Sequence, residues 1–301
     1  MRVFVTGASG FVGSAIVADL VAAGHSVLGL ARTDAGAAGV AALGADVHRG
    51  SLEDLDSLRK GAAGADGVIH TAFIHDFSKF KENCEIDGRA IEALGAELAG
   101  SGRTLIVTSG IALLSPGQVS TERSRPSPHA HVPRVSEQAG EAAKARGVRA
   151  MAIRLPPSVH GDGDHGFVPL LINLAREKGV SAYIGEGLNR WPAVHRLDAA
   201  RLYRLALEKG SSDARYHAIG DEGVPFRDIA AVIGKRLNIP VVAKSPEEAA
   251  AHFGWFAGFA GIDCPSTASI TRDELGWRPT GPGLLADLDR PAYFENMTRA
   301  A

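Results

Sequence analysis

The sequence predicts an α/β protein in which a doubly wound parallel sheet is followed by a smaller, mainly helical lobe. The first half alternates short β-branched runs with alanine-rich stretches of helical period, which is the pattern of βαβ units. The composition changes after Arg154, where a loop rich in Pro, Gly and Asp begins. The length of 301 residues, 45% of them hydrophobic, allows two domains with a large apolar core.

The expected elements of the first half follow one another in a regular order. Strands are predicted at residues 2–6, 25–30, 45–48, 67–71, 103–109 and 148–155. Helices are predicted between them at residues 14–23, 52–61, 84–99 and 136–146. Because parallel strands need long right-handed crossovers, this order predicts helices on both faces of the sheet and a ligand at the carboxyl ends of the strands.

The second half is expected to return once to the sheet and otherwise to form the lobe. Its elements are predicted to be helices at 167–177 and 198–209, a strand at 214–219, and mainly helices from residue 223 onward. We therefore assign residues to two parts, the sheet domain at 1–158 with 196–220 returning to it, and the lobe at 159–195 and 221–301.

Composition and charge argue against several classes of protein. The net charge is −2 without long runs of like charge, so neither nucleic acid nor a membrane is an expected partner. Cys84 and Cys264 fit no disulfide or metal pattern, which favours a reducing compartment such as the cytoplasm. The chain opens on a strand, which leaves no room for a signal peptide, and no apolar run reaches the roughly 18 residues of a membrane span. A small-molecule substrate and a monomer or homodimer are expected.

A glycine-rich turn lies between the first strand and the first helix. In Thr6-Gly7-Ala8-Ser9-Gly10-Phe11-Val12-Gly13, Gly7 permits the tight turn, Gly10 allows close approach of a diphosphate, and Gly13 allows the helix to pack on the sheet. The helix amino terminus would supply unpaired amides and partial positive charge. The sheet domain is therefore predicted to be a Rossmann domain that binds a dinucleotide, with Ser9, Phe11 and Val12 also in contact with it.

Arg32 points to the kind of dinucleotide. It follows the second strand, where an acidic residue usually holds the ribose of NAD and where an arginine can pair with the 2′-phosphate of NADP. NADP(H) is therefore the expected cofactor and NAD(H) the less favoured one. A solvated surface arginine is the alternative interpretation. Ser51 and Leu52, after the third strand, should border the adenine.

These motifs, with three further ones, resemble a known family. The further motifs are Val68-Ile69-His70-Thr71-Ala72, Leu105-Ile106-Val107-Thr108-Ser109, and Arg154-Leu155-Pro156 followed by Val159-His160-Gly161. The chain resembles the extended and atypical short-chain dehydrogenase/reductases, which include NAD-dependent epimerase/dehydratases. The resemblance implies the strand order 3-2-1-4-5-6-7 and a C-terminal substrate lobe. It also implies cofactor contacts at Thr71, Ala72, Phe73, Thr108, Glu137, Pro156 and Ser158.

The chain departs from that family at the catalytic positions. The family carries a Tyr and, four residues later, a Lys before the sixth strand, and here Pro133 and Glu137 stand at those positions. The usual serine position falls on Gly110. This combination resembles the atypical branch, in which the nucleotide half is kept and the usual acid/base pair is missing.

Other residues must then supply the chemistry. We consider His160 or water relayed by Ser109 as the proton source, and Arg134 as the group that polarises the substrate oxygen. Solvent alone is a further source. Asp162 and Asp164 could indicate calcium, and His160 with His165 could indicate zinc. The calcium loop lacks a third oxygen ligand and has Asn173 where it needs a Glu, and no metal is expected. The aromatic residues within 251–261 form either the core of the lobe or the wall of an apolar substrate pocket.

Three functions remain open on the sequence. The first is an NADP(H)-dependent oxidoreductase that reduces a carbonyl or imine group of a small, partly apolar substrate. The second is a redox sensor that binds the dinucleotide and a partner protein without turnover. The third, a nucleotide-sugar epimerase or dehydratase, is weakened because that chemistry depends most on the missing Tyr and Lys.

Overall fold

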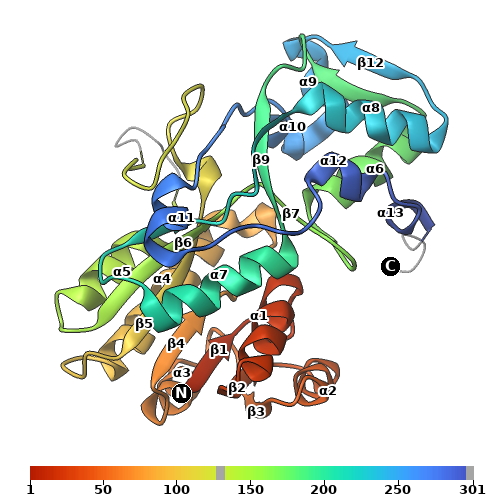
Figure 1. The fold of residues 1–301 in the computed structure, drawn as a ribbon. Coiled ribbons are helices and arrows are strands. Elements are labelled where there is room, and N and C mark those ends of the chain that lie inside the picture. The colour runs from red at the N-terminus through yellow and green to blue at the C-terminus, as the bar shows by residue number, and fades with distance from the viewer. Residues whose placement is uncertain (127–132, 296–301) are drawn as a thin grey trace.

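A seven-stranded sheet, parallel throughout, forms the base of the molecule (Figure 1). The computed structural model describes residues 1–126 and 133–295. In spatial order the strands are β3 (Asp46–Arg49), β2 (Ser26–Ala31), β1 (Arg2–Thr6), β4 (Gly67–His70), β5 (Thr104–Gly110), β6 (Arg149–Leu155) and β10 (Arg215–His217). This confirms the doubly wound sheet and the predicted order 3-2-1-4-5-6-7.

Helices cover both faces of the sheet, and each face has its own apolar core. One face carries α1 (Phe11–Ala22), α2 (Asp34–Ala42) and α7 (Arg196–Lys209). The other carries α3 (Leu55–Ala63), α4 (Phe80–Glu97) and α5 (Ser136–Lys144). Short 3-10 turns, η1 (Phe77–Lys79) and η2 (Ile111–Leu113), follow β4 and β5.

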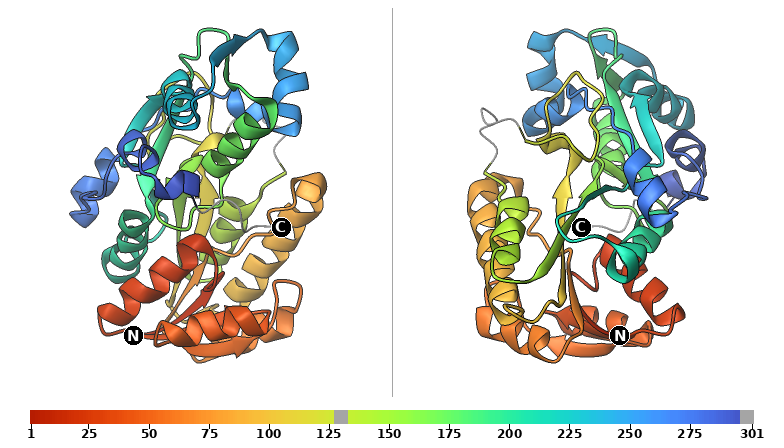
Figure 2. Two further views of the ribbon diagram at one scale, coloured as in Figure 1. Left: turned by 90° about the vertical axis from the view of Figure 1, so that its right-hand side faces the viewer. Right: turned by 60° about the vertical axis from the view of Figure 1, so that its left-hand side comes forward.

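The lobe lies above the carboxyl ends of the central strands (Figures 1 and 2). Its helices are α6 (Phe167–Lys178), α8 (Phe226–Leu237), α9 (Pro246–Phe253), α10 (Ala257–Ala260), α11 (Ser269–Leu275), α12 (Leu284–Leu288) and α13 (Ala292–Glu295), with the 3-10 turn η3 (Gly254–Phe256). It also contains strands, β7 (Ser158–His160), β9 (Arg190–His195) and β11 (Asp221–Pro225) in one sheet and β8 (Ser181–Ile184) and β12 (Val241–Lys244) in another. These five strands and helix α2 are not among the elements predicted from the sequence.

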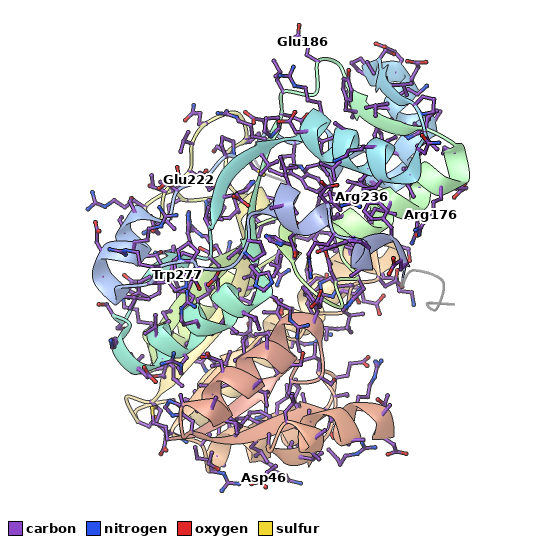
Figure 3. All side chains as sticks on the ribbon, turned by 45° about the vertical axis from the view of Figure 1, so that its right-hand side comes forward. Asp46, Arg176, Glu186, Glu222, Arg236 and Trp277 are labelled. Carbon is purple, nitrogen blue, oxygen red and sulfur yellow. The ribbon has the colours of Figure 1, made fainter. Side chains whose placement is uncertain are left out.

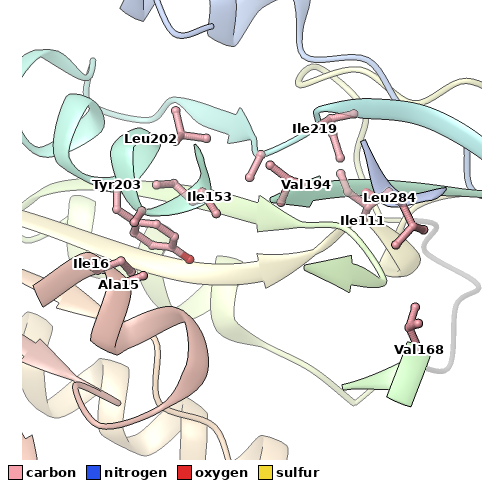
Figure 4. Close-up of a cluster of buried hydrophobic side chains, with 14 of the residues drawn as sticks. Ala15, Ile16, Ile111, Ile153, Val168, Val194, Leu202, Tyr203, Ile219 and Leu284 are labelled. Atoms are coloured by element: carbon pink, nitrogen blue, oxygen red, sulfur yellow. The ribbon is translucent and has the colours of Figure 1, made fainter. Parts of the chain in front are cut away.

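One apolar core continues from the sheet into the lobe. Figure 4 shows Ile16 of α1 and Tyr203 of α7 within the same buried cluster as Ile153 of β6, and the cluster reaches Leu284 of α12. Asp46 and Glu186 mark opposite ends of the molecule in Figure 3. The sheet and the lobe are therefore packed against each other rather than joined by a linker.

The segment after α11 ties the lobe to the sheet. Trp277, labelled in Figure 3, is fully buried, and its indole donates to the Asp198 carbonyl at 3.0 Å. The Asp198 carboxylate accepts from the amides of Thr280 at 3.0 Å and Gly281 at 2.8 Å. Asp198 thus anchors the returning chain to the first turn of α7, which fixes the lobe over the sheet.

Candidate functional site

The turn after β1 is built so that glycine is required. Gly7 has φ +71°, and a Cβ there would lie 2.7 Å from Thr71 Oγ1 and 2.8 Å from the Ala72 nitrogen. A Cβ on Gly13 would lie 1.9 Å from the Gly7 carbonyl oxygen. Neither position can carry a side chain without a shift of the backbone, so β1, β4 and α1 approach one another as closely as they do only because of these glycines.

The amino end of α1 opens at this turn without a side-chain cap. Gly10 is the N-cap residue, and no side chain accepts from the amides that follow it, including those of Phe11 and Val12. Ser9 precedes it and is exposed. Amides in the first turn of a helix have no intrahelical acceptor, and with the helix dipole they favour an anion such as a diphosphate.

A second feature also fits a dinucleotide. The Ser158 hydroxyl is buried and has no hydrogen-bond partner among the residues that the structure describes. It lies just beyond buried Pro156, after the carboxyl end of β6. A buried hydroxyl without a partner is costly unless a ligand satisfies it. The glycine turn and Ser158 are therefore groups of this site that could hold a dinucleotide.

Arg32 follows strand β2, and Arg49 is the last residue of strand β3. Arg32 is exposed and makes no hydrogen bond or ion pair with any residue of the described ranges. Arg49 lies at the end of the neighbouring strand and pairs with Asp34 at 2.8 Å. Ser51 is partly exposed and Leu52 is buried just beyond Arg49. Arg32 is therefore the guanidinium of this edge that is available to a 2′-phosphate.

Arg196 lies over the glycine turn, although it was not among the site residues predicted from the sequence. Its guanidinium carbon is 4.5 Å from the Phe11 ring centroid, and it donates to Ser14 Oγ at 3.0 Å and to the Asp162 carbonyl at 2.8 Å. Its Nε is buried and has no partner within residues 1–126 and 133–295. A lone arginine at the start of a helix forms no motif, so only the fold brings it here.

Arg134 is held at the carboxyl end of β5. Its Nε donates to Ser136 Oγ at 2.9 Å, and its Nη2 donates to the Thr108 carbonyl at 3.2 Å. The guanidinium carbon lies 4.2 Å from the ring centroid of Phe73, which is the third residue after β4. Since arginine has five N–H donors, two bonds leave others for a substrate oxygen.

A chain of buried hydrogen bonds holds Ser136 in place, and Ser136 in turn holds Arg134. Ser136 donates to Asp87 Oδ2 at 2.5 Å, and the other Asp87 oxygen lies 3.1 Å from His70 Nε2. His70 Nδ1 in turn lies 2.9 Å from the Thr6 hydroxyl. Burial opposes ionisation of Asp87, but His70, Arg134 and Ser136 outweigh it and hold the Asp87 pKa below its usual range. The carboxylate therefore balances the charge of Arg134.

The Thr108 hydroxyl already has two hydrogen-bond partners within the fold and is therefore not free to bond a substrate. Its hydroxyl bonds the His70 carbonyl and the Tyr203 hydroxyl, both at 2.8 Å. Tyr203, labelled in Figure 4, is fully buried, and burial raises the pKa of its hydroxyl above the usual range. This tyrosine cannot replace the family's acid, because its hydroxyl is buried away from any substrate, is already bonded to Thr108, and has a raised pKa that makes it a weak proton donor.

Glu137 is predicted to contact the cofactor, and its carboxylate is bonded to two arginines inside the protein. Glu137 accepts from Arg154 Nε and Nη2, both at 2.8 Å, and from Arg215 at 3.1 Å. Arg154 is fully buried and Glu137 is 8% exposed. Burial opposes ionisation of Glu137, but Arg154, with smaller contributions from Ser109 and Arg215, outweighs it and lowers the Glu137 pKa. Glu137 and Ser109 thus face the interior between α5 and β6, where Glu137 neutralises two arginines.

The structure also gives His160 a place away from solvent. The side chain has 0% exposure, and its Nδ1 lies 2.9 Å from Asp287 Oδ2. Asp287 is buried and lies 3.3 Å from the Tyr293 hydroxyl, while the His195 ring packs on His160 at 5.6 Å. Nε2 has no partner among the described residues. A side chain without accessible surface cannot touch a substrate unless the lobe rearranges, so His160 is not positioned as the proton donor here.

The loop between β7 and α6 covers the glycine turn. His165 packs edge-on against Phe11 with 5.7 Å between ring centroids. Asp164 accepts from the Gly166 amide at 2.7 Å, and burial raises its pKa to about 6. In the described ranges no three His, Cys, Asp or Glu side chains are grouped to hold a metal ion. No helix of these ranges is long and apolar enough to cross a membrane.

The fold and the turn define a Rossmann protein of the kind that binds nicotinamide dinucleotides. Comparison with family models gives the family itself, since residues 3–219 match the NAD dependent epimerase/dehydratase family. The chain belongs to this family. The resemblance drawn from the sequence motifs is thereby confirmed.

Relatives and solved structures extend the similarity over the whole chain. It is 53% identical over 299 residues to Uncharacterized protein C2A9.02 of Schizosaccharomyces pombe, covering 98% of this chain and 100% of the relative. It is 28% identical to the 4-hydroxy-2-methyl-3-oxo-4-farnesyl-3,4-dihydroquinoline-1-oxide ketoreductase of Stigmatella aurantiaca, covering 84% of this chain and 80% of that one. The dTDP-glucose 4,6-dehydratase DesIV of Streptomyces venezuelae, solved with NAD, has a TM-score of 0.78, 22% identity and 98% coverage of both chains, and so shares the fold.

Proposed function

We propose that this protein is an NADP(H)-dependent reductase acting on a carbonyl or imine group of a small, partly apolar substrate. The observation that carries the proposal is Arg134, held at the carboxyl end of β5 by Ser136 and Thr108 with N–H groups to spare. It lies on the Phe73 ring, so a substrate there meets both a cation and an apolar wall. The similarity to a ketoreductase supports the same reading.

The residues of the chain perform three tasks in this mechanism. A nicotinamide cofactor held here would supply the hydride for the substrate carbon. The turn from Gly7 to Gly13 and Ser158 orient the cofactor against the substrate. Arg134 donates hydrogen bonds to the substrate oxygen and stabilises the negative charge that grows on it. Because arginine stays protonated at all ordinary pH values, the proton that completes the alcohol or amine comes from water.

Turnover distinguishes this enzyme from a dinucleotide-binding sensor. NADPH should be consumed above the protein-free rate when aldehydes, ketones, quinones and cyclic imines are offered, as followed by loss of absorbance. Tight NADPH binding without turnover, together with a stable protein partner, would instead establish the sensor.

Arg32 should decide which cofactor is preferred. NADPH is expected to bind at least tenfold more tightly than NADH, about 1.4 kcal/mol, because an exposed and unpaired guanidinium can bond the 2′-phosphate. Arg32→Ala should remove most of this difference and leave NADH binding unchanged. Titration calorimetry with both cofactors measures it, and equal dissociation constants in the unmutated protein would refute the preference.

Arg196 should affect both cofactors equally. Its guanidinium lies beside Phe11 and Ser14 at the diphosphate end of α1, and its Nε lacks a partner. Arg196→Leu keeps an apolar contact with Phe11 and should weaken NADPH and NADH alike by about tenfold. The Arg32→Ala variant is the matched control, since only it should distinguish the two cofactors. A loss confined to NADPH would assign Arg196 to the 2′-phosphate instead.

A further inference from the structure

Six partly or largely exposed aromatic side chains gather beside Arg134. They come from three separated segments of the chain, and we call them the aromatic group: Phe73, Phe77, Phe80, Phe167, Trp255 and Phe259. The chain has only eighteen Phe, Trp and Tyr residues, so a third of them lie here. Large apolar side chains that stay accessible in one place mark a binding surface more often than a core.

The rings form a continuous path that starts at Arg134. Phe73 lies under the guanidinium, and its centroid is 6.1 Å from that of Phe80. Phe80 stacks on Phe77 at 5.8 Å, and Phe77 stacks on Trp255 at 4.9 Å with 19° between the planes. The path therefore runs from the sheet domain, at Phe73, into the lobe, at Trp255.

Trp255 marks the open end of the path. It is 56% exposed, whereas Trp191 and Trp277 are fully buried. Phe256, next to it, is buried and packs on Phe167 at 5.0 Å, so the core of this stretch is already supplied by another ring. The sequence left two interpretations of residues 251–261. Phe253 and Phe256 belong to the core and Phe259 packs against it, whereas Trp255 is the ring of this stretch that stays exposed.

We propose that the substrate is a planar aromatic carbonyl compound, such as an aryl ketone or a quinone. Its ring lies against the aromatic group, and its oxygen faces the N–H groups of Arg134. The inference rests on the proposed reductase function and names the substrate class of the same site. Stacked or edge-on rings gain roughly 3- to 10-fold in affinity beyond the burial of equal apolar area, so a saturated ring of the same size should bind less well.

Binding of inert amides tests this without requiring turnover. The probes are 2-naphthamide and decahydro-2-naphthamide, which share a carbonyl oxygen and a carbon skeleton but differ in planarity. On the protein saturated with NADP⁺, 2-naphthamide should bind about tenfold more tightly and should quench tryptophan fluorescence, because Trp255 is the exposed tryptophan. Equal dissociation constants for the two amides would overturn the proposal.

Two ring variants test whether the aromatic group causes the preference for the planar amide. Trp255→Leu and Phe77→Leu should each reduce the preference for the planar amide at least threefold and leave NADP⁺ binding unchanged. Leu188→Ala is the control, since Leu188 is a 48% exposed side chain of the lobe outside the aromatic group, and it should keep the full preference. A preference that survives both ring variants would place the amide elsewhere and overturn the proposal.

Equal amide binding combined with NADPH consumption on aliphatic carbonyls would overturn only the substrate class, whereas absence of any turnover would count against the proposed function itself.

Discussion

Replacement of Arg134 by alanine is expected to lower kcat with any accepted carbonyl substrate by about 10²- to 10³-fold, the usual loss when a donor to a developing oxyanion is removed. NADPH affinity should change less than twofold, because the guanidinium bonds Ser136 and Thr108 rather than the glycine turn. Stopped-flow measurement of NADPH oxidation at saturating cofactor separates the two quantities. The loss should appear in kcat as well as in kcat/KM, since the interaction strengthens as negative charge develops on the oxygen.

Two controls distinguish this role from structural damage. Arg134→Lys keeps the charge but cannot bond Ser136 and the Thr108 carbonyl in the same geometry, so activity should recover only in part. Added guanidinium should restore part of the activity of Arg134→Ala and none of that of Arg134→Lys. The wild-type rate should also stay flat from about pH 6 to 9, because the proton comes from water. A wild-type kcat in Arg134→Ala would refute the mechanism, and a fall in rate near pH 6.5 that His160→Ala removes would return the proton to His160.

The sheet could be predicted because its signals are local. β-branched runs alternate with helical segments, and the glycine turn of residues 6–13 marks where the first strand becomes a helix. Helix α2 was missed because it buries only Val40 and otherwise consists of Asp34, alanine and glycine, so it has no apolar face to detect. The strands β9 and β11 contain Pro192 and Pro225, residues that normally argue against a strand.

Residues of the candidate site could be predicted from the sequence only where they belong to a local motif. The glycines and Arg32 follow from their position next to a strand, and Arg134 from its place before helix α5. The residues that hold Arg134 in place come from elsewhere, since Asp87 lies on α4 and His70 on β4. No spacing in the sequence relates these two positions to Arg134, and only the packing of α4 against α5 brings the carboxylate to Ser136.

Glu137 shows why a family position can change its task. In the resembling enzymes a lysine at this position serves the cofactor, but here the carboxylate is bonded on both oxygens by buried Arg154 and also by Arg215. A lysine would place a third positive charge beside two arginines with nothing to balance them. Glu137→Lys is therefore expected to prevent folding, and the family's Tyr and Lys cannot be restored by simple substitution.

Glu137→Gln should cost about 3–5 kcal/mol of unfolding free energy at pH 7, because it removes one partner of a buried ion pair and leaves Arg154 uncompensated. Urea denaturation measures the loss. Glu141→Gln on the same helix is the matched control, since Glu141 pairs with Arg215 but is 52% exposed, and it should cost less than about 1 kcal/mol. Equal losses in the two variants would show that burial of the Arg154 pair is not what stabilises this region.

The dependence of this loss on pH identifies ionisation as its cause. Burial opposes ionisation of Glu137, but hydrogen bonds and charge from Arg154, with Ser109 and Arg215, hold its pKa below the usual value of 4.5. A carboxyl whose pKa is lower in the folded state than in the unfolded state contributes its full stability above the unfolded value and loses it as the pH falls through the folded value. The wild type should therefore lose this contribution below about pH 4.5, whereas Glu137→Gln has none to lose. The two unfolding free energies should converge on acidification, and a constant difference down to pH 3 would mean that shape rather than charge makes Glu137 necessary.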